Sequence, residues 1–234
     1  MPGARYLIVG ANRGIGLEFV KQILQNSGNR VIGTYRNPLT IDELNKLSET
    51  PSNKGRLSLI RLDMNDEQSC KAAASEVGAK VGTIDTLIVN AGAHGGKALL
   101  TEDISNISRL FDNNVLGPLR IFQAFVPLLQ DRSSANDVLP KIALISSEAG
   151  SLTVSKHGRG PAYAMSKAAL NMMGRKLAYE LELSGIAVGL LHPGWVQTDM
   201  GGPNAVLTPE VSVQGMLQVI EKLNIGNSGG ILGL

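Results

Sequence analysis

The chain has 234 residues, 43% of them hydrophobic, which suffices for one α/β domain that we expect to span residues 1–234. The formal net charge is only +2, and the positive residues are scattered, which argues against a nucleic-acid partner. The single cysteine, Cys70, excludes an internal disulfide, and no Cys/His cluster has the spacing of a metal site. The first apolar stretch, residues 6–9, is too short for a signal peptide or a membrane span, so we expect a cytosolic protein without membrane contact.

Apolar runs of strand length alternate with longer helical patterns along the chain. Several runs are continuous rather than alternating, as in parallel strands that are buried on both faces. The predicted strands are residues 6–9, 31–34, 57–62, 87–90, 142–146, 186–192 and 230–234. The first helix, about residues 14–26, places Leu17, Val20, Ile23 and Leu24 on one stripe. The alternation predicts an α/β fold, a doubly wound parallel seven-stranded sheet with helices on both faces, whose ligands bind at the carboxyl ends of the strands.

A glycine-rich turn follows the first predicted strand and leads directly into the first helix. Its glycines are Gly10, Gly14 and Gly16, in the spacing Gly-x-x-x-Gly-x-Gly. Glycines allow a tight turn, and they let main-chain N–H groups approach a pyrophosphate at the helix N-terminus. A purely structural turn would use the same residues, so the motif indicates dinucleotide binding only together with its strand-turn-helix context.

The end of the second predicted strand bears on the choice of cofactor. An acidic residue there usually holds the ribose 2′-hydroxyl of NAD, but this strand ends in Thr34, Tyr35 and Arg36. Arg36 and Arg13 would place two guanidinium groups where a 2′-phosphate could bind, which favours NADP(H). The alternative is that both arginines are solvated surface residues.

Tyr163 and Lys167 lie four residues apart at the start of a long helical pattern and therefore share one helical face. A free tyrosine has a pKa near 10, too high for efficient proton transfer at neutral pH. A nearby ammonium, together with the positive nicotinamide of the oxidised cofactor, would lower the tyrosine pKa. The pair predicts proton exchange with an alcohol or carbonyl oxygen, although Tyr-x-x-x-Lys also occurs by chance in helices.

The fifth predicted strand ends in Ser146 and Ser147. A serine hydroxyl at this edge can donate a hydrogen bond to a substrate oxygen and stabilise charge that develops there. Successive strand residues point to opposite sides, so we expect only one of the two to face the substrate. A serine pair that simply ends a strand is the alternative interpretation.

These motifs occur together in the order typical of the classical short-chain dehydrogenase/reductases, and the chain resembles that family over nearly its whole length. The matching positions are the glycine turn at residues 10–16, Asp63, the Asn90-Ala91-Gly92 segment, Asn114, the serine pair, Tyr163 with Lys167, Pro193-Gly194 and Thr198. The resemblance implies a Rossmann-type fold. Residues 10–18 and 192–200 look most like the carbonyl reductases of the sniffer and C-factor group, which implies reduction of carbonyl compounds with NADPH.

The resemblance also assigns roles to individual residues. Ser147 corresponds to the serine that orients the substrate, Tyr163 to the general acid, and Lys167 to the residue that holds the nicotinamide ribose. Asn114 corresponds to the residue that steadies a water in the proton relay. The implied cofactor contacts are Gly10, Asn12, Arg13, Gly14, Ile15, Gly16, Arg36, Asp63, Asn90, Ala91, Gly92, Tyr163, Lys167, Pro193, Gly194, Val196 and Thr198.

Within this set Asp63 corresponds to the adenine contact, Asn90 to a support of the central sheet, and Thr198 to the contact with the nicotinamide carboxamide. The structural alternatives are a cap for Asp63, a helix-bend residue for Asn114 and a turn former for Thr198.

The chain departs from the family pattern in two places. Val9 stands where a threonine usually precedes the first glycine, which removes a hydroxyl that could brace the turn. Ser147 lies sixteen residues before Tyr163, slightly more than usual, so Ser146 remains the alternative.

The long insertion before the tyrosine that some monomeric carbonyl reductases carry is absent, which favours a homodimer made through the two long central helices. The chain stops at Leu234, barely through the seventh predicted strand, so we expect a C-terminal tail to be missing from the sequence.

Three other features could border a substrate. His94 and His157 could lie beside it, whereas a role as catalytic base is not expected for these histidines or for His192. Trp195 could line the pocket or simply pack. Residues 200–208 are rich in glycine and proline, which predicts a mobile cover without readable specificity.

The sequence therefore predicts an NADPH-dependent oxidoreductase that reduces a small carbonyl compound, an aldehyde, ketone or quinone, with Tyr163 as general acid. One alternative is an NAD-linked alcohol dehydrogenase that works in the oxidative direction. The other is a dinucleotide-binding signalling or regulatory protein whose turnover is incidental.

Overall fold

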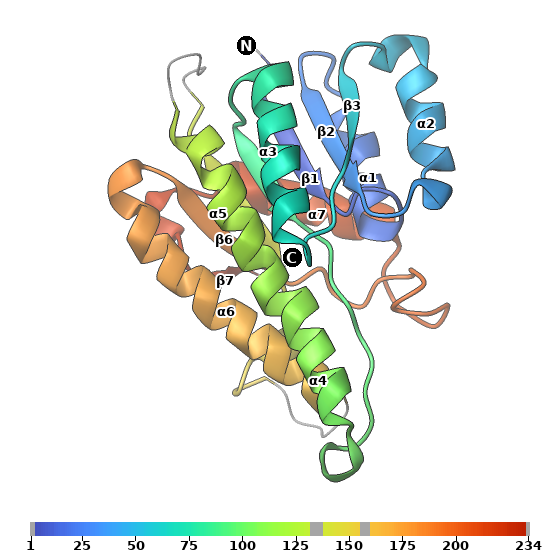
Figure 1. Ribbon diagram of the computed structural model, residues 1–234, viewed down its shortest axis with the longest axis vertical. Helices are drawn as coiled ribbons and strands as arrows, with labels where there is room; N and C mark the ends of the chain where they lie inside the picture. Colours follow the sequence, from blue (N-terminus) through green and yellow to red (C-terminus); the bar gives the residue numbers. More distant parts are fainter. Residues whose placement is uncertain (1–2, 132–137, 155–159, 233–234) are drawn as a thin grey trace.

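Seven parallel strands form one sheet in the order β3-β2-β1-β4-β5-β6-β7 (Figure 1). The computed structural model describes residues 3–131, 138–154 and 160–232. The strands are β1 Arg5–Val9, β2 Arg30–Tyr35, β3 Leu57–Arg61, β4 Thr86–Val89, β5 Lys141–Ile145, β6 Ala187–Leu191 and β7 Ile231–Leu232. Each lies within two residues of its predicted range, apart from residues 233 and 234, which fall outside the described part. The doubly wound, Rossmann-like α/β fold predicted from the sequence is confirmed.

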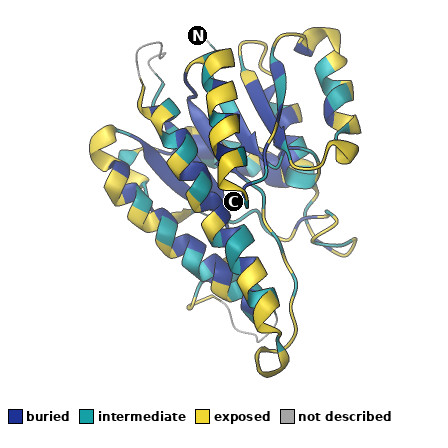
Figure 2. Ribbon diagram, in the orientation of Figure 1, coloured by how far each residue is buried: buried dark blue, intermediate teal, exposed yellow. Residues whose placement is uncertain are grey.

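Helices cover both faces of the sheet. They are α1 Gly14–Ile23, α2 Asp42–Glu49, α3 Glu67–Val81, α4 Ile104–Phe111, α5 Gly117–Gln130, α6 Pro161–Leu181 and α7 Pro209–Lys222. Helices α3, α5 and α6 share one buried apolar cluster with the sheet, and α1, α2 and α7 share the other. In Figure 2 the buried stripes of these helices are dark blue and their outer stripes yellow, which is the amphipathic pattern of a two-sided sandwich.

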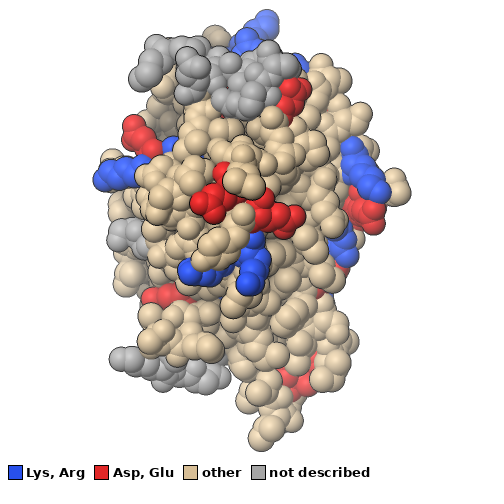
Figure 3. Space-filling view, turned by 90° about the vertical axis from the view of Figure 1, so that its left-hand side faces the viewer, with Lys and Arg blue, Asp and Glu red and all other residues tan. Residues whose placement is uncertain are grey.

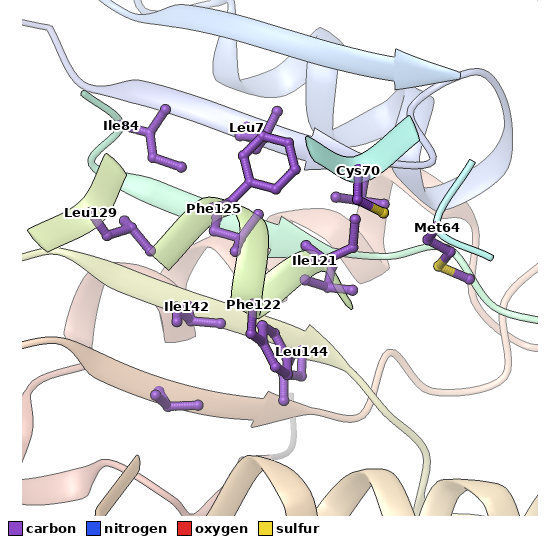
Figure 4. Packing of buried hydrophobic residues seen from close by; sticks show 14 of the residues in the cluster. Leu7, Met64, Cys70, Ile84, Ile121, Phe122, Phe125, Leu129, Ile142 and Leu144 are labelled. Atoms are coloured by element: carbon purple, nitrogen blue, oxygen red, sulfur yellow. The ribbon is translucent and has the colours of Figure 1, made fainter. Parts of the chain in front are cut away.

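The larger cluster joins the central strands to α3 and α5 (Figure 4). Phe125 of α5 is fully buried, and it packs in one cluster with Leu7 of β1 and Ile142 of β5. Deleting a side chain of this kind leaves a cavity and typically costs about 3 to 5 kcal/mol. The cluster therefore fixes β1, β4 and β5 relative to one another, and with them the residues at their carboxyl ends.

Strand order reverses between β1 and β4, so the crossovers from these neighbouring strands run to opposite sides. A crevice opens at such a switch point, outside the carboxyl ends of the strands. The glycine turn follows β1 there, and residues 90–92 follow β4. In the described part of the chain, no helix is long and apolar enough to cross a membrane.

Candidate active site

The glycine turn after β1 is tightly packed against its neighbours. Gly10 has φ +80°, which favours glycine, and a Cβ on Gly16 would lie 2.0 Å from the carbonyl oxygen of Gly10. The amide of Asn90 donates a hydrogen bond of 2.8 Å to that same oxygen. Asn90 thus braces the turn from β4, and α1 begins at Gly14 with its first N–H groups toward the crevice.

Thr34 braces the turn from the other side. Its hydroxyl accepts a hydrogen bond of 3.2 Å from the N–H of Gly10, and its side chain is buried. The hydroxyl that the sequence lacks at Val9 is therefore supplied by the adjacent strand. Sequence analysis missed this residue because the register that sets Thr34 beside Gly10 exists only in the folded sheet.

A cleft of about 1290 Å³ runs along the carboxyl edge from β2 and β3 to α6. This exceeds the usual size of a small-molecule pocket and leaves room for a dinucleotide beside a small substrate. The predicted cofactor residues in its wall are Gly10, Asn12, Arg13, Gly14, Ile15, Arg36, Asp63, Asn90, Ala91, Gly92, Tyr163, Lys167, Pro193 and Thr198. Three predicted contacts are not in the wall. Gly16 packs behind the turn, Gly194 forms a bend with φ +75°, and the buried Val196 pairs with Leu207.

The two arginines lie in the wall of the cleft but differ in their partners. Arg36 is exposed immediately after β2. Arg13, at the start of α1, forms an ion pair of 2.7 Å with Asp199, and both side chains are more than 70% exposed. Asp199 comes directly after Thr198 in the loop that follows β6. This carboxylate, which the sequence did not single out, joins that loop to the glycine turn.

Tyr163 and Lys167 face the cleft from the first turns of α6. Lys167 Nζ lies 5.7 Å from the centre of the Tyr163 ring and donates a hydrogen bond of 2.9 Å to the main-chain carbonyl of Ile145. Burial lowers the pKa of Lys167 to about 8. Burial also raises the pKa of Tyr163, and a hydrogen bond with Ser147 opposes that rise. In the chain alone the tyrosine pKa thus moves opposite to the expected direction, because desolvation of the ring has the largest effect.

The two serines after β5 point in different directions. Ser147 forms a side-chain hydrogen bond with Tyr163, and its Oγ also accepts a bond of 3.1 Å from the N–H of Ala149. Ser146 is buried, and its hydroxyl donates to Asn171 Oδ1. Asn171 lies one turn beyond Lys167 on α6, so the sequence spacing 163, 167, 171 already held the signal for this contact. Of the two serines, Ser147 is therefore the one beside the tyrosine.

Asn114 lies in a π-helical segment, Asp112–Leu116, between α4 and α5. Its Oδ1 accepts from the N–H of Ala93, and its Nδ2 donates to the carbonyl of Ala93 and to Ser166 Oγ, each at 2.8 or 2.9 Å. Both amide hydrogens are thus used inside the protein. The side chain holds the segment after β4 against α6, and the second lone pair of its Oδ1 is the side-chain group left to accept a hydrogen bond from a water.

Asp63 and Thr198 both make local turn contacts. Asp63 Oδ1 accepts a hydrogen bond of 3.0 Å from the N–H of Asn65, and Thr198 Oγ1 accepts one of 3.2 Å from Gly201. These bonds leave both residues in the cleft wall. The alternative of Asp63 as a helix cap is wrong, because Asp66 caps α3 and Asp63 bonds within the preceding turn. For both Asp63 and Thr198, turn formation coexists with a position in the cleft wall.

The loop that follows β6 is held by several internal hydrogen bonds. The indole of Trp195 donates to the carbonyl of Gly201 at 2.8 Å, and Gln197 Nε2 donates to Ala205 at 2.9 Å. Trp195 lies outside the cleft wall and keeps the loop folded. Main-chain N–H groups of the segment add to these bonds, since Gly202 donates to Thr198 and Leu207 donates to Trp195. Residues 200–208, whose composition predicts mobility, are thus tied to the start of the loop.

His94 is the histidine at the catalytic end of the cleft. Its ring meets the Tyr163 ring edge to face, with centroids 4.7 Å apart. His192 lies behind the cleft, near Glu148, and His157 lies outside the described residues. His94 therefore lies beside Tyr163, at the position from which the sequence predicts it to border a substrate.

These features define an α/β protein with a dinucleotide cleft and a serine-tyrosine-lysine group at one end of it. The model of the short chain dehydrogenase family matches residues 5–205, and the chain belongs to this family of oxidoreductases.

Similar proteins agree with that assignment. An uncharacterized oxidoreductase of Schizosaccharomyces pombe is 35% identical over 97% of this chain and 93% of its own length. The C-signal protein of Myxococcus xanthus is 46% identical over 63% of this chain and 87% of its own. Among solved structures, an NADPH-bound carbonyl reductase from chicken fatty liver has a TM-score of 0.91 and 35% identity, covering 100% of this chain and 92% of that one. The carbonyl reductase Sniffer of D. melanogaster has a TM-score of 0.92 and 28% identity, covering 99% and 96%. The resemblance to the sniffer and C-factor group is thereby confirmed.

Proposed function

We propose that the protein reduces a carbonyl compound, an aldehyde, ketone or quinone, with NADPH. The observation that carries the proposal is the convergence of Ser147 and Lys167 on Tyr163 at the end of a cleft that begins at two arginines. NADPH supplies the hydride when bound. The similarity to an NADPH-bound carbonyl reductase supports the choice of cofactor and reaction.

Ser147, Tyr163 and Lys167 have different roles toward the substrate oxygen. Ser147 and Tyr163 are hydrogen-bond partners, so a carbonyl oxygen between them would accept from both hydroxyls. Tyr163 then donates its proton to that oxygen as negative charge develops. With a pKa of about 8, Lys167 is mainly protonated at pH 7, and its positive charge favours the resulting phenolate.

The choice of NADPH over NADH is assigned to the end of the cleft that lies beside β2. No acidic residue follows β2 there, and Arg13 and Arg36 would hold the 2′-phosphate of NADP. Comparing wild type with Arg36→Ala separates this from an NAD-linked alcohol dehydrogenase. We expect Kd for NADPH to rise at least 10-fold while Kd for NADH stays within 2-fold. Equal losses for both cofactors would remove the assignment.

The reaction is tested with purified protein and a panel of aldehydes, ketones and quinones, by following NADPH oxidation. Tyr163→Phe should lower kcat at least 100-fold, because the general acid is lost while the ring packing is kept. Arg175→Lys, far from the cleft, serves as the control. Equal turnover by wild type and Tyr163→Phe would reject Tyr163 as the proton donor.

A second candidate function follows from the similarity to the protein named C-signal. The chain could be a dinucleotide-binding signalling or regulatory protein whose turnover is incidental. Tight NADPH binding measured by calorimetry, together with no turnover across the panel, would favour this candidate over the enzyme.

We also propose a homodimer in the cytosol. Met165, Met172 and Tyr179 follow one another at seven-residue spacing on α6, and all three are exposed. Much of the face on the α6 side is uncharged, with a cluster of acidic and basic side chains near its middle (Figure 3). Burying such a stripe against a second copy would remove apolar surface from water. Sedimentation should give a dimer for wild type and a monomer for Met172→Glu, with Val211→Glu, at a similarly exposed position on α7, as the control. The cytosolic location is supported by the lone cysteine, Cys70, which is buried.

A further inference from the structure

The turn that carries Ser147 is attached to β6 by a side chain rather than by the sheet. The parallel ladder between β5 and β6 continues as far as Ser146, whose N–H donates to the carbonyl of Leu191 at 2.8 Å. The next carbonyl in phase would be that of Pro193, but it accepts a bond of 2.7 Å from the hydroxyl of Ser212 on α7. The two backbones have diverged, so the sheet no longer holds the chain beyond Ser146.

His192 takes over at this point. Its Nδ1 accepts a hydrogen bond of 3.3 Å from the main-chain N–H of Glu148. Ser147 therefore lies between two anchored main-chain N–H groups. The N–H of Ser146 is held by the carbonyl of Leu191, and the N–H of Glu148 is held by the imidazole of His192. The main-chain N–H of His192 itself donates to Leu232 of β7 at 3.2 Å, which fixes the backbone that carries the ring.

The geometry also determines the tautomer of His192. Because Nδ1 accepts, the hydrogen of the neutral ring is on Nε2, which lies 3.6 Å from a carboxylate oxygen of Glu148. Burial lowers the pKa of His192, and the charge of Glu148 acts in the opposite direction. The ring is not part of the cleft wall, so any effect on the reaction must pass through the serine turn.

We propose that His192 is a positioning residue that extends the β5–β6 ladder by one hydrogen bond and so holds the Ser147 hydroxyl against Tyr163. This inference rests on the proposed function in that Ser147 is taken to bind the substrate oxygen. A displacement of about 1 Å of such a group can lower turnover about 100-fold, so one bond at the base of the turn is expected to matter.

Three variants distinguish the acceptor from the bulk of the ring. The Oδ1 of His192→Asn can occupy the place of Nδ1, whereas His192→Gln moves the polar group toward Nε2 and His192→Leu removes the acceptor. We expect Asn to keep kcat within about 3-fold of wild type and Gln and Leu to lose at least 10-fold. Kd for NADPH should stay the same in all three, because the His192 ring is not part of the cleft wall. Folded Gln and Leu variants with wild-type kcat would overturn the proposal.

A spectroscopic readout tests the positioning without turnover. The ¹³Cζ shift of labelled Tyr163 at pH 7 reports its hydrogen bond with Ser147. His192→Leu should change this shift as Ser147→Ala does, His192→Asn should not, and the Leu change should add nothing in the Ser147→Ala background. An unchanged shift in His192→Leu, or a proton on Nδ1 in ¹⁵N spectra, would also overturn it. If wild type reduced no carbonyl, the proposed function would fail while this spectroscopic test still decided the role of His192.

Discussion

The two ends of the sheet each bury a charge, but they treat it differently. At the amino end, Asp85 is fully buried and meets the guanidinium of Arg5 through both carboxylate oxygens, at 3.1 and 3.2 Å, while the N–H of Arg5 donates to it at 2.7 Å. At the carboxyl end, Lys167 is 5% exposed and bonds to a neutral carbonyl, and among the described residues no carboxylate pairs with it. At the amino end the buried carboxylate is neutralised by Arg5, which stabilises the fold. At the carboxyl end the buried ammonium of Lys167 has no such counter-charge among the described residues, which costs stability.

The amino end should give the largest effect on stability. Asp85→Ala leaves the guanidinium of Arg5 without its carboxylate in a buried place, which typically costs about 3 to 5 kcal/mol. Chemical denaturation should show this loss in the free energy of unfolding. Molecules that remain folded at low temperature should keep wild-type kcat, because Asp85 is at the opposite edge from the cleft. A loss of less than 1 kcal/mol would contradict the assigned role.

At the carboxyl end we expect the opposite result, in which removing the buried charge raises stability and lowers activity. Lys167→Met removes a charge whose burial shifts its pKa from 10.5 to about 8, equivalent to about 3 kcal/mol at neutral pH. The lost hydrogen bond to Ile145 returns about 1 kcal/mol of that. We expect the variant to be about 2 kcal/mol more stable at pH 7 and at least 100-fold less active. A variant that is both less stable and fully active would invert the comparison.

The same charge predicts a dependence of stability on pH. Below pH 8 Lys167 is protonated in both the folded and the unfolded chain, and the folded state bears the full cost of burial. Between about pH 8 and 10.5 the unfolded chain binds the extra proton, so the stability of wild type rises with pH relative to Lys167→Met. The gap between the two unfolding free energies should therefore close and then reverse across this interval, leaving wild type about 1 kcal/mol more stable through its hydrogen bond to Ile145. Parallel curves would show that Lys167 does not titrate there.

At the carboxyl end, the residues differ in how far they could be predicted from the sequence. The glycine turn, Tyr163 and Lys167 carry their chemistry in short local spacings, so strand-turn-helix order and one helical turn suffice to predict them. Thr34, His192 and Asp199 act through contacts across strands or between loops, and these depend on register and on where the backbones diverge. The choice of Ser147 over Ser146 likewise needed the direction of each side chain at the end of β5.

The smallest effect is expected from the exposed charges at the mouth of the cleft. In Arg13 and Asp199 both side chains are largely in water, and such a pair contributes only about 0 to 1 kcal/mol. Asp199→Asn frees Arg13 for a 2′-phosphate, so KM for NADPH should fall about 2- to 3-fold while KM for NADH stays constant. Glu67→Gln, which breaks an equally exposed pair with Lys71 on α3, is the matched control and should change neither. If KM for NADH fell as much as that for NADPH, Asp199 would act on the shape of the loop after β6 rather than on the charge that Arg13 offers to the cofactor.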